Sequence, residues 1–304
     1  MAKRKNKGKN IIWFLLAVAV LYILKSGWLD NIFKISGLKE GVVTDAPLSI
    51  HVIDVGQGES ILIKGPEKNM LIDAGESGNG LKICNYLKSQ EVDKIDYLVA
   101  THPHSDHIGS MDYIISRRDI DIGKIVMGKL HESVTPTSPA YQNFLNAVKN
   151  KNMKIKITGS GDEYDLGDGC VVKVLGPTEP VEDLNENSLV MKLTYKDFSM
   201  LFGGDAGTEA ENKMISEGID VSADVMTAAH HGSSSSTSAN YLKKVNPEYA
   251  VISCGVDNAY GHPHDKTLQR LAKNNVKVYR TDLDGTVVIA TDGQTVEFKI
   301  SGKK

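Results

Sequence analysis

Residues 101–109, Thr-His-Pro-His-Ser-Asp-His-Ile-Gly, constrain this chain more than any other stretch. Four potential metal ligands lie within it: His102, His104, Asp106 and His107. They directly follow an apolar run, and a strand that ends in a loop lets alternate side chains converge on one point. Imidazole together with carboxylate suits Zn²⁺, Mn²⁺ or Fe²⁺. The pattern therefore predicts a metal site at a strand end, and the alternative is a solvated, histidine-rich turn.

Further candidate residues follow other predicted strands. Asp205 lies in a Gly-Gly-Asp-Ala-Gly turn and could bridge two cations, with one oxygen on each. His230 and His231 are neighbours whose side chains point in different directions, so we expect one to bind metal and the other to contact substrate or donate a proton. His262 and His264 form another pair, placed either near the site or in a surface turn that precedes a helix.

These residues together predict a hydrolytic site for two metal ions. His102 and His104 are expected to bind one ion and Asp106 and His107 the other, with Asp205 between them. Two cations about 3.5–4 Å apart can activate a water and stabilise charge on the substrate oxygen. The candidates for catalytic steps are Asp106, His230 and His262. Asp73, at another strand end, is expected either to support the metal loop by accepting hydrogen bonds or to form a simple turn before glycine.

The first 40 residues differ in charge from the rest of the chain. They hold eight Lys or Arg and two Asp or Glu, which is +6, and the formal net charge of −3 leaves −9 for the remainder. Lysines and an arginine precede the apolar run 11–24. We predict a basic cytoplasmic tail (1–10), a single transmembrane signal anchor (11–29), a linker (30–46) and an extracytoplasmic domain (47–304). A cleavable signal peptide, which would make the protein secreted, is the alternative.

The rest of the composition restricts the remaining function classes. Three widely spaced cysteines without a Cys-x-x-Cys pattern indicate buried thiols rather than a disulfide framework. The acidic main domain carries no electrostatic footprint for nucleic acid. No nucleotide cofactor is expected, and the sequence identifies no protein partner.

Short strands alternate with helices from residue 48 onward, in two halves of similar style. This alternation predicts an α/β fold of four layers, an αββα sandwich. The polar, glycine-rich stretch 162–169 is expected to be a turn near the midpoint.

The order of these motifs resembles the metallo-β-lactamase superfamily. Within it, the chain is most similar to the extracellular hydrolase domain of the ComEC-type competence family, which takes up DNA. The stretches that carry this second resemblance are 54–60, 101–109, 187–190, 203–205, 230–233 and 260–263. The resemblance implies an αββα fold and a hydrolase that uses two divalent ions, Zn²⁺ or Mn²⁺.

The sequence departs from the family pattern at three points. Many members supply another histidine for the first metal between the main motif and the bridging Asp, where this chain has only the early His131. Asn187 could face that metal instead. Glu59 stands where the ComEC-type turn commonly has Asp. ComEC-type transporters embed this domain in a polytopic channel, whereas one apolar segment is found here, so transport by this chain alone is not expected.

The main functional hypothesis is a membrane-anchored phosphodiesterase or nuclease, with DNA as one possible substrate. The alternatives are a hydrolase of cell-wall phosphoesters of the phosphocholine type, a hydrolase of a lactam, lactone or thioester, and a binding module without turnover. Loop 128–139 is expected to cover the site and decide the substrate. The candidate substrate-binding residues are His231, Asn187, Ser188 and His264.

Overall fold

The computed structural model describes residues 45–302, and this part of the chain forms two β-sheets. The strands of the first sheet are β1 (Leu48–Val52), β2 (Ile61–Lys64), β3 (Asn69–Ile72), β4 (Lys94–Ala100), β5 (Asp121–Gly128), β6 (Ile155–Thr158), β14 (Val287–Thr291) and β15 (Val296–Ile300). They lie in the order β15-β14-β1-β2-β3-β4-β5-β6. The last two of these strands therefore complete the sheet that the first strands begin.

The second sheet is built from the middle of the chain. Its strands are β7 (Glu163–Gly167), β8 (Cys170–Gly176), β9 (Val190–Tyr195), β10 (Phe198–Phe202), β11 (Val225–Thr227), β12 (Tyr249–Ile252) and β13 (Lys277–Arg280). Their spatial order is β13-β12-β11-β10-β9-β8-β7. Strands β10 to β13 are parallel to one another, as are β3 to β6 in the first sheet.

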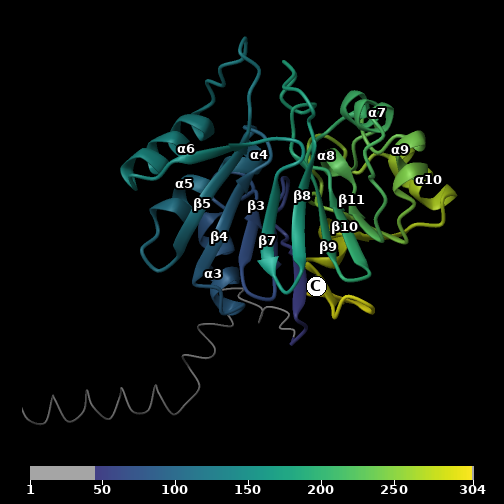
Figure 1. The fold of residues 1–304 in the computed structure, drawn as a ribbon, viewed down its shortest axis with the longest axis horizontal. Coiled ribbons are helices and arrows are strands. Elements are labelled where there is room, and N and C mark those ends of the chain that lie inside the picture. Colours follow the sequence, from purple (N-terminus) through teal and green to yellow (C-terminus); the bar gives the residue numbers. More distant parts are fainter. Residues whose placement is uncertain (1–44, 303–304) are drawn as a thin grey trace, which may run out of the picture. The chain divides into compact units, whose positions relative to one another are not determined.

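Helices cover the outer face of each sheet (Figure 1). The first sheet packs against α3 (Gly80–Ser89), α5 (Met111–Ser116) and α6 (Pro139–Asn150), and the second against α7 (Thr208–Ser216), α9 (Ala239–Val245) and α10 (Asp265–Lys273). The sequence of α6 shows why such a helix forms. Ser138 accepts a hydrogen bond from the Tyr141 backbone N–H, Pro139 occupies the first turn, and Phe144 and Val148 bury one face.

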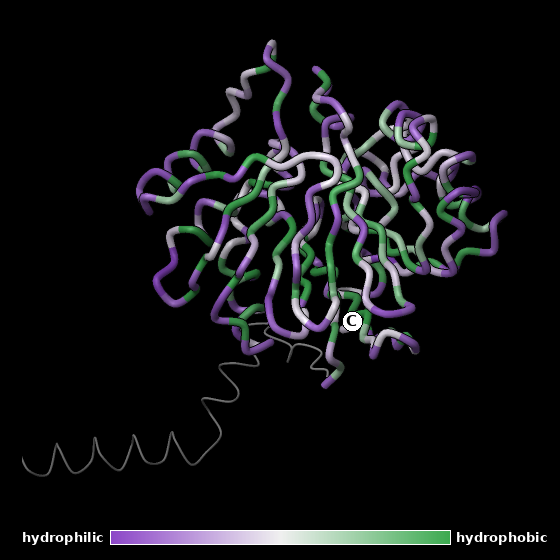
Figure 2. The backbone as a smooth tube through the Cα atoms, in the orientation of Figure 1, coloured by the Kyte–Doolittle hydropathy of each residue, from purple (hydrophilic) through white to green (hydrophobic). Residues whose placement is uncertain are grey.

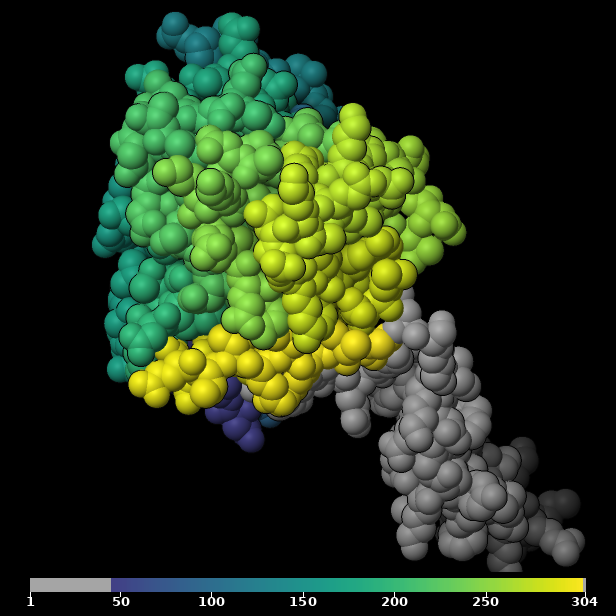
Figure 3. Space-filling model, turned by 90° about the vertical axis from the view of Figure 1, so that its right-hand side faces the viewer, coloured from purple at the N-terminus to yellow at the C-terminus, as the bar shows by residue number. Residues whose placement is uncertain are grey.

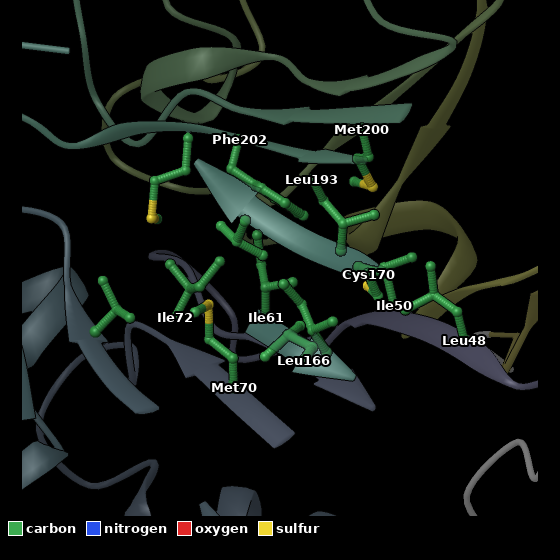
Figure 4. Packing of buried hydrophobic residues seen from close by; sticks show 14 of the residues in the cluster. Leu48, Ile50, Ile61, Met70, Ile72, Leu166, Cys170, Leu193, Met200 and Phe202 are labelled. Atoms are coloured by element: carbon green, nitrogen blue, oxygen red, sulfur yellow. The ribbon is translucent and has the colours of Figure 1, made fainter. Parts of the chain in front are cut away.

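Three hydrophobic clusters separate the four layers. One lies between the sheets, where Ile50, Met70 and Ile72 face Leu193 and Phe202 (Figure 4). The other two lie between each sheet and its helices. Figure 2 shows the same arrangement, with hydrophobic residues along the strands and hydrophilic residues on the outer helix surfaces and loops. The predicted αββα fold is confirmed.

The structure corrects three details of the predicted elements. Residues 163–167, within the expected turn 162–169, form strand β7, because Tyr164 and Leu166 alternate into the core between the sheets. Strand β6 was not predicted. The short helix α4 (Ser105–Ile108) was not predicted either, and Gly109 and Ser110 separate it from α5.

The predicted tail and anchor, and the linker as far as residue 44, lie outside the described residues. Within residues 45–302, no helix is long and apolar enough to cross a membrane. Figure 3 shows the side of the described domain formed by the later part of the chain, with the last strands along its lower edge.

His51 in β1 makes the stability of the fold depend on pH. Its ring contacts Ser49 Oγ at 2.8 Å and Tyr86 Oη at 2.8 Å, and burial lowers its pKa to about 3. The unfolded chain therefore binds a proton that the folded chain excludes between pH 6.5 and 3. We expect acidification from pH 6.5 to 5 to cost about 2 kcal/mol of unfolding free energy through this residue.

Urea unfolding of the metal-free protein at several pH values measures this effect. The pH dependence of His51→Gln should be shallower than that of the wild type. Equal slopes for the wild type and His51→Gln would contradict the assignment.

Candidate metal centre

The carboxyl ends of parallel strands from both sheets meet at one end of the domain. Asp73 follows β3, the His-x-His-x-Asp-His motif follows β4, Asp205 follows β10, and the His230-His231 pair follows β11. Figure 1 shows α4 and α8 (Ala229–Gly232), which carry parts of these motifs, at the same end. The two sheets thus bring together residues more than 120 positions apart, as in the contact of His107 with His231.

Four residues form the first ligand group: Asp106, His107, Asp205 and His231. His107 Nε2 lies 3.1 Å from Asp205 Oδ1 and 3.3 Å from His231 Nε2. His231 Nε2 lies 3.2 Å from Asp106 Oδ2. Each potential ligand atom is within 4.8 Å of the others, so this group could hold a metal ion.

Hydrogen bonds on the far side of each ring orient these two imidazoles. His107 Nδ1 donates to Asp73 Oδ2 at 2.6 Å, and His231 Nδ1 donates to the Ser253 carbonyl oxygen at 2.9 Å. Both bonds place a proton on Nδ1, so Nε2 is the nitrogen that each ring can offer to a metal ion. The two Nε2 atoms face one another beside two carboxylates, an arrangement that favours a shared positive charge.

Asp73 supports this arrangement from the Nδ1 side of the His107 ring. It is fully buried, adopts a left-handed conformation with φ of 57°, and also accepts hydrogen bonds from the Thr101 backbone N–H at 2.9 Å and from Thr101 Oγ1 at 2.6 Å. Its carboxylate therefore fixes both the first residue of the metal loop and the ring of His107.

The second ligand group comprises His102, His104 and Asp205. His102 Nε2 lies 3.0 Å from His104 Nδ1 and 3.7 Å from Asp205 Oδ2. His230 Nε2 is also 3.7 Å from Asp205 Oδ2. His230 and His231 both have left-handed backbones, with φ of 53° and 55°, which is how two consecutive residues can both direct their rings toward Asp205.

Asp205 is shared by the two groups, with one oxygen toward each. Oδ1 faces His107 and His231, and Oδ2 faces His102 and His230. Oδ1 is buried and accepts no hydrogen bond among the described residues. A buried carboxylate oxygen without a donor is costly unless a cation compensates it, so the residues present fit a pair of divalent ions.

The electrostatics of the site also favour cations. Burial opposes charge on His107, but Asp205 and Asp73 raise its pKa well above the usual value. Burial lowers the pKa of His102 well below its usual value, which keeps that ring neutral, as a ligand must be. Burial also raises the pKa of Glu59, which lies with Asp73 and His107 behind the ligands, to about 7.

A cleft of about 410 Å³ opens onto Asp106, Asp205, His230 and His231. Pro136, Thr137 and Ser138 form one wall, so loop 128–139, which was expected to cover the site, lies beside it. Leu184 and Asn185, from the loop between β8 and β9, form another part of the lining. Figure 1 shows both loops projecting beyond the strand ends.

His262 also lines this cleft, and its Nδ1 is buried without a hydrogen-bond partner among the described residues. Burial lowers its pKa to about 4, so the ring is neutral near pH 7. A neutral ring can give or accept a hydrogen bond there.

Three predicted substrate-binding residues have other contacts. Asn187 was expected to face the metal ion held by His102 and His104, but its amide is used elsewhere. Its Oδ1 accepts from the Val181 backbone N–H at 3.0 Å, and its Nδ2 donates to the Lys129 carbonyl oxygen at 2.9 Å. It joins the two loops that border the cleft. Ser188 Oγ accepts from the Asp205 backbone N–H at 3.1 Å, so it positions the shared carboxylate.

His264 is the third of these residues, and it does not line the cleft. Its Nδ1 accepts from the Ser234 backbone N–H at 2.9 Å, and its Nε2 contacts the Tyr260 carbonyl oxygen at 3.2 Å. It supports the loop that carries Tyr260 and His262.

Sequence reasoning did not identify several residues that line the cleft. Gln57, Pro103, Ser105 and Tyr260 are among them. Gln57 lies in a tight turn where a Cβ on Gly58 would come within 2.2 Å of the Asp106 carbonyl oxygen, so only glycine allows this approach. The Gly-Gln-Gly pattern signalled the turn but not its contact with the metal loop.

Comparison with known families agrees with this geometry. The profile of the metallo-beta-lactamase superfamily matches residues 53–256, which include both ligand groups. The chain belongs to this superfamily. A metallo-hydrolase from the archaeon Ignicoccus hospitalis has a similar fold, with a TM-score of 0.52, 17% identity, and coverage of 80% of this chain and 99% of that chain.

Two curated relatives of this metallo-beta-lactamase domain are competence proteins of the ComEC type. ComE operon protein 3 of Bacillus subtilis (strain 168) is 29% identical over 257 residues, which cover 78% of this chain and 32% of the relative. Competence protein ComA of Neisseria gonorrhoeae is 28% identical over 248 residues, covering 81% and 32%. The chain spans about a third of the length of these relatives.

Proposed function

We propose that this protein is a phosphodiesterase that uses two divalent ions, Zn²⁺ or Mn²⁺, and that nucleic acid is its substrate class. The observation that carries the proposal is the position of Asp205, with one carboxylate oxygen directed at each of two ligand groups. His102 and His104 would hold one ion, Asp106, His107 and His231 the other, and Asp205 both.

The residues of the chain prepare the site for such a reaction. Bound divalent ions would polarise a phosphoryl oxygen and lower the pKa of an attacking water. Asp73 and Ser253 hold His107 and His231 with their Nε2 lone pairs toward the ions. His230 is partly exposed beside Asp205, and the neutral His262 faces the same cleft, so both can hydrogen-bond to substrate oxygens.

The names of the relatives favour a phosphodiester over an acyl substrate. One relative is called Competence protein ComA, and another is called Recombination protein 2. Both words concern DNA. The cleft is open and bordered by two loops, which suits the end of a polymer as well as a small diester.

The location of the protein belongs to the same proposal. A single N-terminal anchor would place the hydrolase domain outside the cytoplasm, where the substrate would be exogenous nucleic acid or a phosphodiester of the cell envelope. The anchor rests on the apolar run 11–24 and the basic residues before it.

The purified full chain, loaded separately with Mn²⁺ and Zn²⁺, tests the proposal. The substrates are single- and double-stranded DNA, bis(p-nitrophenyl) phosphate and a chromogenic lactam. We expect cleavage of DNA and of the small diester, and loss of both activities in His104→Ala, which removes a ligand of one ion. The matched variant His131→Ala, which replaces a half-buried histidine outside both ligand groups, should stay active.

The other outcomes separate the alternatives. Cleavage of the small diester alone would favour a phosphoester of the cell wall, and cleavage of the lactam alone would overturn the proposal. A protein that binds two ions and turns over none of these substrates would not be a phosphodiesterase.

A further inference from the structure

Tyr260 is an exposed aromatic residue at the mouth of the cleft. Its side chain is 62% exposed and lines the same cleft as Asp106, Asp205 and His231. One face of its ring stacks on His262, with the centroids 5.6 Å apart and the planes 17° apart. The His262 ring in turn lies 5.5 Å from the His230 ring and 6.1 Å from the His231 ring, so one imidazole separates Tyr260 from the first ligand group.

The loop that carries Tyr260 is held by its own hydrogen bonds. Asn258 Nδ2 donates to the carbonyl oxygens of Gly255 and His262, and Asn258 Oδ1 accepts from the His262 backbone N–H at 3.0 Å. His264 Nε2 lies 3.2 Å from the Tyr260 carbonyl oxygen. These contacts present the Tyr260 ring in a fixed place without burying it, so a ligand that stacks on it pays little to order the loop.

The rest of the cleft lacks the usual source of affinity for a phosphodiester chain. Of the described residues that line it, none is Lys or Arg. Three apolar residues border it: Pro103, Pro136 and Leu184. Beyond the metal ions, contacts with a substrate must therefore come from apolar side chains and ring stacking rather than from positively charged side chains. Stacking of a base on an aromatic side chain contributes substantially to binding, whatever the base.

We propose that Tyr260 is the stacking platform for a planar ring of the substrate, the nucleobase adjacent to the phosphodiester that is cleaved. This inference rests on the proposed function, because it places that phosphodiester at the two ligand groups. Tyr260 thereby becomes a specificity-determining residue. It selects diesters that carry a base beside the reacting phosphate over diesters of the same charge that carry none.

A binding measurement without turnover tests the stacking directly. The probe is a short single-stranded oligonucleotide with phosphorothioate linkages and a 2-aminopurine at its end, added to the full chain loaded with Mn²⁺. Stacking should quench the fluorescence of the probe on wild-type protein and on Tyr260→Phe. Tyr260→Leu should remove the quenching, and Tyr113→Leu, which removes an exposed tyrosine on α5, should retain it. All variants should bind the same number of metal ions.

Kinetics with two matched substrates complete the test. We expect the wild-type KM for a thymidine tetramer to be roughly 5- to 100-fold lower than that for an abasic tetramer with the same phosphates. Tyr260→Leu should lose this difference between the two KM values.

The outcomes distinguish this inference from the function on which it rests. Equal KM values for the two tetramers on wild-type protein, or a preference that survives in Tyr260→Leu, would overturn the role of Tyr260 and leave the phosphodiesterase intact. If wild-type protein with two bound ions cleaved neither tetramer, both the role of Tyr260 and the proposed phosphodiesterase function would be overturned.

Discussion

Replacing Asp205 with Asn is expected to reduce the bound metal from two ions to at most one per chain and to lower kcat/KM by about 1,000-fold or more. The carboxylate directs Oδ1 at one ligand group and Oδ2 at the other. An amide keeps the shape of the side chain but supplies one weak oxygen ligand and one N–H donor. Metal content by mass spectrometry and initial rates on a small diester measure the two effects.

Asp197→Asn, in the exposed turn between β9 and β10, is the matched control and should retain both ions and full activity. An Asp205→Asn protein that still binds two ions with unchanged affinity would show that this carboxylate does not connect the two sites.

Replacing Asp73 with Asn is expected to weaken metal binding by about 10- to 100-fold, although the residue need not touch either ion. The Asp73 carboxylate accepts three hydrogen bonds, from Thr101 N, Thr101 Oγ1 and His107 Nδ1. An amide NH₂ in place of the oxygen near His107 would donate to Nδ1, which moves the ring proton to Nε2, the atom that faces Asp205. The lost acceptors should also cost about 1–3 kcal/mol of stability.

Metal titration by calorimetry and urea unfolding of the metal-free protein measure these two effects separately. Asn accepts the left-handed backbone of position 73 more readily than most residues, so backbone strain does not confuse the result. A variant that loses stability but keeps wild-type metal affinity would show that Asp73 supports the fold and not the ring of His107.

The sequence predicted the fold class because each sheet is dominated by short apolar strands separated by helices with one apolar face. It did not predict that β14 pairs with β1, since nothing in the local pattern of either strand specifies a partner more than 230 residues away. Strand β7 was mistaken for a turn because Glu163 and Asp165 are exposed, while Tyr164 and Leu166 alone carry the core pattern.

The main residues of the site were predictable because their chemistry and their position at strand ends coincide. The orientation within the His230-His231 pair was not, because it depends on the left-handed backbones of both residues and on the hydrogen bond that His231 Nδ1 donates to the carbonyl oxygen of Ser253, just after β12. Asn187 was misplaced for a similar reason. An amide side chain can bind a metal ion or link two loops by hydrogen bonds, and the sequence does not show which partners it has.

The connection of β14 to β1 affects when the first sheet can be completed during synthesis. Strand β1 leads into the turn that holds the metal loop, through the hydrogen bond from Glu59 N to the Asp106 carbonyl oxygen, but its neighbour β14 is synthesised more than 230 residues later. Contacts between distant residues also form slowly. The first sheet is therefore completed only after β14 has been synthesised, and we expect the turn that holds the metal loop to become ordered late in folding.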